Sequence, residues 1–370
     1  MTKVKLSAVF GGASSAPVER VVCHPRLPLV AAVDGGRRAV HVLDCGRDEL
    51  GLLASIGSGS AAYGEVEPWE RGMRDAFAAW HPVEPQLLVA TKATVWSWTP
   101  TELRELTALP AGAAYEELLF SPDGSTLWAS PSSTSSRDMD AIDLATGEVV
   151  AVGAYPWGGA HPSGAVMLTT SQDQGSSRID FLRVEQGAPA DRRLQRLMVV
   201  LGNDAYQPPI FSSDGRFFAI RGNAYGETLT AFEFPSLEKV LHEEFDGTED
   251  DGWWRNDITF GAKPGALWVG TPTGALWSYD LVAGTKTEHG VLTGHQVTAI
   301  GCTSLGHLVI GCDNGEILLA SISDGAAADH PIDPDAVRTD VAAFLAATED
   351  VPADIDDVES FLIAANDNDR

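Results

Sequence analysis

The chain of 370 residues has little positive charge. It carries 25 Lys and Arg residues against 52 Asp and Glu residues, a formal net charge of −27 with histidine neutral. Such an acidic protein repels phosphate backbones, which argues against sequence-independent nucleic-acid binding. Its acidity favours cationic or neutral partners. No apolar run approaches the roughly 20 residues that span a bilayer, and the start MTKVKLSAVFGGASS is too short for a signal peptide. We therefore expect a cytoplasmic protein that binds no membrane.

Cysteine and the common catalytic motifs are also scarce. The four cysteines form no C-x-x-C pair and no zinc-binding spacing, so we expect free thiols. The chain contains no G-x-S-x-G, H-E-x-x-H, G-x-x-x-x-G-K-[ST] or strand-associated G-x-G-x-x-G motif. These absences argue against the common hydrolases, metalloproteases and nucleotide-dependent enzymes. We expect a non-catalytic protein that needs no cofactor and no metal.

What the chain does contain is a repeat. Seven times, a few apolar residues lead through a turn of Pro, Asp or Gly into an apolar strand, as in VVCHPRLPLVAAV and LLFSPDGSTLWAS. Successive turns are separated by 57, 40, 40, 51, 50 and 41 residues. A propeller blade of four strands needs about 40 to 45 residues, so the longer gaps indicate loop insertions. Apolar residues at period two follow each turn, which is typical of antiparallel strands.

The two ends of the repeat region complement each other. The seventh repeat stops after its third strand at Glu316–Ser323, and a spare strand at Lys3–Gly11 precedes the first repeat. Pairing these two strands would close the ring and cover an exposed sheet edge. The sequence thus predicts an all-β, seven-bladed propeller over residues 1–325, closed by the N-terminal strand.

The phrases FSPDGSTLWAS, LTGHQVTAIGC and ALWSYDLVAG resemble degenerate repeats of the WD40 family. The resemblance covers roughly residues 1–325, without any Trp-Asp dipeptide and with one convincing Gly-His pair at Gly294–His295. It implies a rigid platform in a multi-protein assembly, since WD40-like propellers mostly serve as scaffolds.

The last residues, 326–370, form an acidic extension with twelve acidic residues against two arginines. Asp333–Glu349 and Ala353–Ala365 each have apolar residues at helical spacing, so we expect two short amphipathic helices. Either this tail packs on the side of the propeller, or its apolar faces dock into a partner. The candidate docking residues are Val341, Phe344, Leu345, Phe361 and Leu362.

Two other patterns suggest metal sites but have simpler interpretations. His24, His81 and His161 occupy the same position in three repeats, each directly before a proline. We interpret them as side chains that cap tight turns, because equivalent positions on different blades lie far apart. Residues 246–252 (DGTEDDG) resemble a calcium loop, but the glycine comes one position late and no downstream Glu follows, which favours a simple acidic loop.

The insertions carry aromatic and acidic residues together. They lie at Gly57–Asp75, Ser130–Arg137, Ser171–Ser177, Gly202–Gln207, Arg221–Glu227 and Phe245–Asp257, mostly in connections that open on one face of a propeller. Exposed aromatic side chains with an acidic rim are typical of protein interfaces, and they favour a partner with a basic or mixed surface. The candidate binding residues are Tyr63, Glu65, Glu67, Trp69, Glu70, Tyr206, Tyr225, Glu249, Asp250, Asp251, Trp253 and Trp254.

The sequence therefore predicts a protein–protein interaction scaffold. Two alternatives remain open at this stage. One is a propeller enzyme of the lactonase, lyase or hydrolase kind with an axial site. The other is a small-ligand or peptide sensor with an aromatic pocket formed by Trp69, Trp253 and Trp254.

Overall fold

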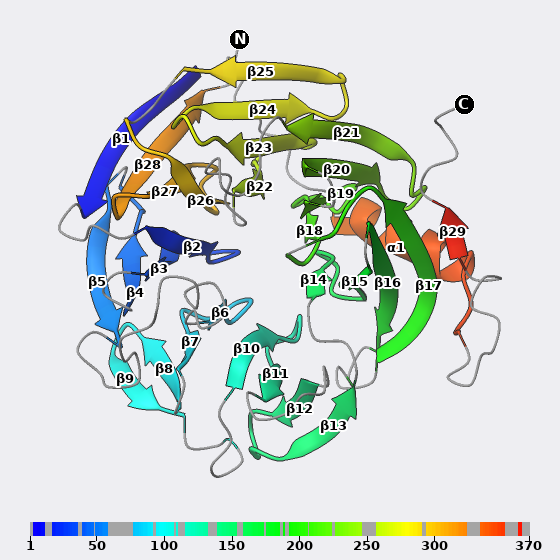
Figure 1. Ribbon diagram of the computed structural model, residues 1–370. Coiled ribbons are helices and arrows are strands. Elements are labelled where there is room, and N and C mark those ends of the chain that lie inside the picture. Colours follow the sequence, from blue (N-terminus) through cyan, green and yellow to red (C-terminus); the bar gives the residue numbers. More distant parts are fainter. Residues whose placement is uncertain are drawn as a thin grey trace.

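A computed structural model shows seven sheets arranged in a ring, which confirms the predicted β-propeller (Figure 1). No helix among the described residues is long and apolar enough to cross a membrane. The residues that the structure describes are 3–11, 17–35, 39–47, 49–57, 77–91, 94–106, 109, 115–131, 139–153, 158–173, 175–185, 188, 192–205, 207–223, 226–245, 257–290, 294–323, 334–351 and 362–364.

Each repeat forms one blade, and its turn phrase joins the two innermost strands. The turn residues reverse the chain between the strands, which makes neighbouring strands antiparallel. Successive side chains of a strand point to opposite faces of the sheet and so face the two neighbouring blades. The first four blades are blade 1 with β2 (Val18–Cys23), β3 (Leu29–Asp34), β4 (Ala39–Asp44) and β5 (Gly51–Ile56); blade 2 with β6 (Phe77–Trp80), β7 (Leu87–Ala90), β8 (Val95–Thr99) and β9 (Glu102–Glu105); blade 3 with β10 (Tyr115–Phe120), β11 (Thr126–Pro131), β12 (Met139–Asp143) and β13 (Val149–Gly153); and blade 4 with β14 (Gly158–Ala160), β15 (Val166–Asp173), β16 (Ser176–Val184) and β17 (Arg192–Leu201).

Blade 7 takes its outermost strand from the N-terminus. Strand β1 (Lys3–Gly11) pairs antiparallel with β28 (Glu316–Ser323), so the predicted ring closure is confirmed at its predicted boundaries. The remaining strands are β18 (Ile210–Phe211), β19 (Phe217–Gly222), β20 (Glu227–Glu233) and β21 (Lys239–Phe245) in blade 5; β22 (Ile258–Phe260), β23 (Ala266–Gly270), β24 (Leu276–Asp280) and β25 (Thr285–His289) in blade 6; and β26 (Val297–Cys302) and β27 (Leu308–Cys312) in blade 7.

The core lies between the blades. Seven clusters of buried side chains each join two neighbouring blades, including one between blades 7 and 1. Burial of these apolar side chains stabilises the ring, since each cluster removes both facing sheets from water. The four cysteines are free thiols, and Cys45 and Cys312 belong to these clusters.

The C-terminal extension packs on the side of the ring at blades 4 and 5. Helix α1 (Pro334–Ala346) lies within the predicted range, and its Val341 and Phe344 complete the cluster between these blades. The prediction of a second helix at Ala353–Ala365 is wrong for residues 362–364. These residues form strand β29 (Leu362–Ala364), which pairs parallel with β17, because the outer edge of blade 4 offers unpaired backbone groups.

Candidate functional site

The insertions open on the same face of the propeller. Successive strands of a blade run in opposite directions, so the connections from second to third strand and from outer strand to the next blade emerge together. The connections that contain residues 58–76, 132–138, 206, 224–225 and 246–256 are all of these two kinds. We call this side of the ring the insertion-bearing face. The prediction of an insertion at residues 171–177 is wrong. Most of these residues belong to β15, which ends at Asp173, and to β16, which begins at Ser176.

The twelve candidate binding residues all lie outside the described residues. They fall in residues 58–76, 206, 224–225 and 246–256, so their use by a partner stays a prediction. What the structure describes is the framework that holds these segments. The most extensive contacts of this framework flank residues 246–256, which connect β21 of blade 5 with β22 of blade 6.

A buried arginine contacts both ends of this connection. The Arg221 guanidinium lies 4.9 Å from the centre of the Phe245 ring, directly before the connection. Its Nε and Nη2 donate hydrogen bonds of 2.9 and 2.6 Å to the two carboxylate oxygens of Asp257, directly after it. The bidentate arrangement fixes the orientation of both groups. One buried side chain therefore holds both Phe245 and Asp257, the residues on either side of the segment that carries Trp253 and Trp254.

The same guanidinium balances a second carboxylate. Arg221 Nη1 lies 3.4 Å from Glu227 Oε2 and donates a 3.1 Å hydrogen bond to the Thr228 carbonyl oxygen. The side chains of Arg221 and Asp257 are fully buried, and that of Glu227 nearly so. Burial raises the pKa of the Asp257 carboxyl, and the Arg221 guanidinium opposes this rise. Arg221 and Glu227, which the sequence predicts in an insertion, are both strand residues.

A buried polar network extends the framework to blade 4. The Ser177 hydroxyl donates a 2.6 Å hydrogen bond to the Asn203 carbonyl oxygen and accepts one of 2.7 Å from the Ala205 amide. The Asn203 amide donates to the Thr228 hydroxyl at 3.0 Å. These bonds hold the connection between blades 4 and 5 against both blades. Satisfied buried networks of this kind rigidify the segments that they join.

The repeated histidines cap turns, as expected, and they also join blades. His24 Nδ1 accepts hydrogen bonds of 3.0 Å from the amides of Arg26 and Leu27. Its Nε2 lies 2.9 Å from the carbonyl oxygen of Glu84 in blade 2. His161 repeats the arrangement, with its Nε2 3.2 Å from the carbonyl oxygen of Gly215 in blade 5. The sequence pattern shows the turn but not the contact to the next blade.

The buried His161 makes stability depend on pH. Burial lowers the pKa of His161 from 6.5 to about 4, so the folded protein binds fewer protons than the unfolded chain between these values. The contribution of His161 to stability is therefore fully present above pH 6.5 and is lost as the pH drops toward 4. The difference in pKa corresponds to about 3 kcal/mol. Urea denaturation at several pH values should show a shallower loss for His161→Asn than for the wild type. An equally steep loss would contradict this, and the exposed His295→Asn serves as control.

The tail residues proposed for docking are in part covered by the chain itself. Val341 and Phe344 are 4% exposed, and Leu345 packs against the same cluster. The Phe344 ring lies 5.4 Å from that of Phe181 and 5.1 Å from that of Phe234. A partner would reach these side chains only if α1 left the ring. Phe361 lies outside the described residues, and Leu362 is the first residue of β29.

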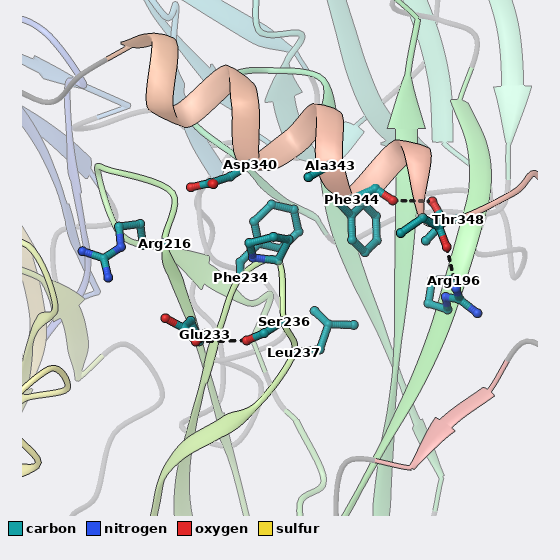
Figure 2. Close-up of a pocket in the computed structure, with 12 residues that line it drawn as sticks. Arg196, Arg216, Glu233, Phe234, Ser236, Leu237, Asp340, Ala343, Phe344 and Thr348 are labelled. Atoms are coloured by element: carbon teal, nitrogen blue, oxygen red, sulfur yellow. Dashed lines mark hydrogen bonds between the residues drawn. The ribbon is translucent and has the colours of Figure 1, made fainter.

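An open pocket of about 510 Å³ lies between α1 and the turn from β20 to β21. Figure 2 shows Phe234 and Phe344 near its centre, with Arg216 and Arg196 at opposite ends. Glu233 lies on the blade side and Asp340 on the helix. The pocket thus has an aromatic centre and a rim of mixed charge, and its volume lies in the range of small-molecule sites.

One arrangement of Ser, His and Asp resembles a catalytic triad in composition. His41 Nδ1 lies 2.9 Å from the Ser55 hydroxyl, and its Nε2 lies 3.2 Å from Asp34 Oδ2. The two ring nitrogens are reversed relative to the serine-hydrolase arrangement. His41 and Ser55 are direct cross-strand neighbours, and Thr230 and His242 repeat the pairing at 3.2 Å in blade 5. We interpret these contacts as cross-strand pairs that fasten the outer strands.

Within the described residues, no group of His, Cys, Asp and Glu side chains is arranged to hold a metal ion. The acidic loop at residues 246–252 lies outside that part of the chain. A scan of the full sequence against protein-family models found no match, and a search of the curated proteins found none either.

Proposed function

We propose that this protein is a non-catalytic scaffold that binds a partner protein through its insertion-bearing face. The observation that carries the proposal is the contact of buried Arg221 with Phe245 and Asp257, the two residues that flank the segment 246–256. A segment with fixed ends loses less conformational freedom on binding than a free loop, which favours affinity. The inter-blade clusters supply the rigid ring on which several such segments are presented together.

The composition of the face defines the kind of partner. Its insertions carry Tyr63, Trp69, Trp253 and Trp254 beside acidic residues, in a chain of net charge −27. Aromatic side chains contribute most of the binding energy in many interfaces, while surrounding charges steer association. The proposed partner is a protein with a basic or mixed surface. The setting is a multi-protein assembly, as the resemblance to WD40-like propellers implies, and we place it in the cytoplasm.

Affinity capture from the native lysate with quantitative mass spectrometry tests the proposal. The double variant Trp253→Ala/Trp254→Ala should lose a partner that the wild type enriches stoichiometrically. The matched control is Val282→Ala/Leu305→Ala, which removes exposed apolar side chains from turns on the opposite face. Loss of the partner in the control but not in the tryptophan variant would contradict the proposal. A chain that captures no protein, but whose melting temperature rises with a small ligand, would support the sensor function instead.

A further inference from the structure

The chain's own C-terminal residues cover the outer edge of blade 4. After α1, the Val351 amide donates a 2.8 Å hydrogen bond to the Leu194 carbonyl oxygen of β17. Further along, β29 pairs parallel with β17 at Leu197–Val199. Figure 1 shows β29 outside β17, at the rim of the ring. The tail thus occupies this edge by backbone pairing over only a few residues, as a short added strand.

A carboxylate of the tail is held by a cluster of arginines beside this edge. Asp350 Oδ2 lies 3.4 Å from Arg183 Nη2 and 3.2 Å from Arg193 Nη1. Its other oxygen accepts a hydrogen bond from the amide of Gln195, a residue that is 1% exposed. The hydrogen bond from Gln195 lowers the pKa of Asp350, together with the hydrogen bond from Arg193 and the charges of Arg183 and Arg193. The cluster is therefore built to receive a carboxylate.

The cluster has more donors than the tail satisfies. Arg196 lies on β17, like Arg193, and its Nη2 donates a 3.2 Å hydrogen bond to the Ala347 carbonyl oxygen. The Nε atoms of Arg183 and Arg196 are buried and have no hydrogen-bond partner within the described part of the chain. Asp350 and Glu185 are both paired with arginines of this cluster. A buried donor without an acceptor is unfavourable, so this cluster favours an additional hydrogen-bond acceptor.

We propose that the outer edge of blade 4 is a binding site for an acidic, extended segment of a partner protein. In its absence, Asp350, Val351 and strand β29 of the chain's own C-terminal extension occupy this edge. The incoming segment pairs with the backbone of β17 and places carboxylates among Arg183, Arg193 and Arg196. The tail is then a tethered competitor that leaves when the partner binds. This site lies on the rim of the ring and is separate from the insertion-bearing face, so the two proposals can fail independently.

Fluorescence anisotropy with the full-length protein tests this site. The probe is a labelled peptide with the sequence of residues 348–365 of this chain. In the wild type, the tethered tail competes at an effective concentration of order millimolar, so the peptide should bind weakly. Asp350→Lys places a positive charge among the arginines and should release the tail, raising the apparent affinity at least about tenfold. The matched control is Glu349→Lys, which makes the same charge change at the exposed neighbouring residue and should bind like the wild type.

Adding Arg183→Ala and Arg193→Ala to Asp350→Lys should abolish the gained affinity. Equal binding by wild type, Asp350→Lys and Glu349→Lys would overturn the proposal, as would a gain that survives removal of both arginines. The measurement runs at moderate ionic strength, because the net charge of −27 repels an acidic peptide at long range. Thermal melting confirms that each variant is folded. If Asp350→Lys does not fold, Asp350→Asn replaces it. This variant should show a smaller gain in apparent affinity for the peptide, and the absence of any gain would overturn the proposal.

Discussion

An Arg221→Met variant should lose about 3 to 5 kcal/mol of its free energy of unfolding, which is one of the largest effects expected for a single substitution here. The guanidinium is fully buried and pairs with Asp257 and Glu227. Methionine fills much of the same volume but leaves both carboxylates buried without their partner. Urea denaturation followed by tryptophan fluorescence measures the change.

Two comparisons distinguish the loss of a buried charge pair in Arg221→Met from the effect of removing any arginine. Arg216→Met removes an exposed arginine from the same blade and should change stability by no more than about 0.5 kcal/mol. Adding Glu227→Gln and Asp257→Asn to Arg221→Met should restore part of the loss, because both buried charges are then removed. Equal unfolding midpoints for Arg221→Met and Arg216→Met would show that the buried cluster does not stabilise the framework.

Phe344→Ala should lower the free energy of unfolding by about 3 kcal/mol and should release α1 from the ring. The Phe344 ring is buried between Phe181 of blade 4 and Phe234 of blade 5. Alanine leaves a cavity at the junction of three elements and removes the largest buried apolar side chain of the helix. Urea denaturation measures the stability, and amide hydrogen exchange of residues 334–351 measures the release of the helix.

The control for this prediction is Arg338→Ala, which truncates an exposed side chain on the same helix. It should leave both the unfolding midpoint and the exchange of the helix near their wild-type values. If Phe344→Ala also leaves them unchanged, the C-terminal helix is not part of the core between blades 4 and 5.

The fold follows from local signals that recur. Each blade depends on a turn and on apolar residues at period two, and both are visible within about a dozen residues. The closing pair of Lys3–Gly11 with Glu316–Ser323 was predictable too, because one spare strand and one missing strand complement each other. Strand β29 was not predictable, because its conformation depends on pairing with β17, which lies more than 150 residues earlier in the chain. Its own apolar spacing fits a helix equally well.

The framework of the candidate site depends on long-range contacts in the same way. Arg221 and Asp257 are 36 residues apart, and no spacing rule connects them. The available signal was Arg221 itself, a charged residue that follows the apolar run Phe217–Ile220 inside a strand. A charge in such a position is rarely buried unless it is paired. The second contact of His24 and His161 likewise depends on the neighbouring blade.

Hydrogen exchange of the purified complex tests the central claim most directly, once a partner has been captured. Binding through the insertion-bearing face predicts slower amide exchange in residues 58–76 and 246–256 when the partner is present. The turns on the opposite face, at residues 280–284 and 303–306, should exchange as they do in the free protein. Protection of these opposite turns, with unchanged exchange in both insertions, would contradict the account.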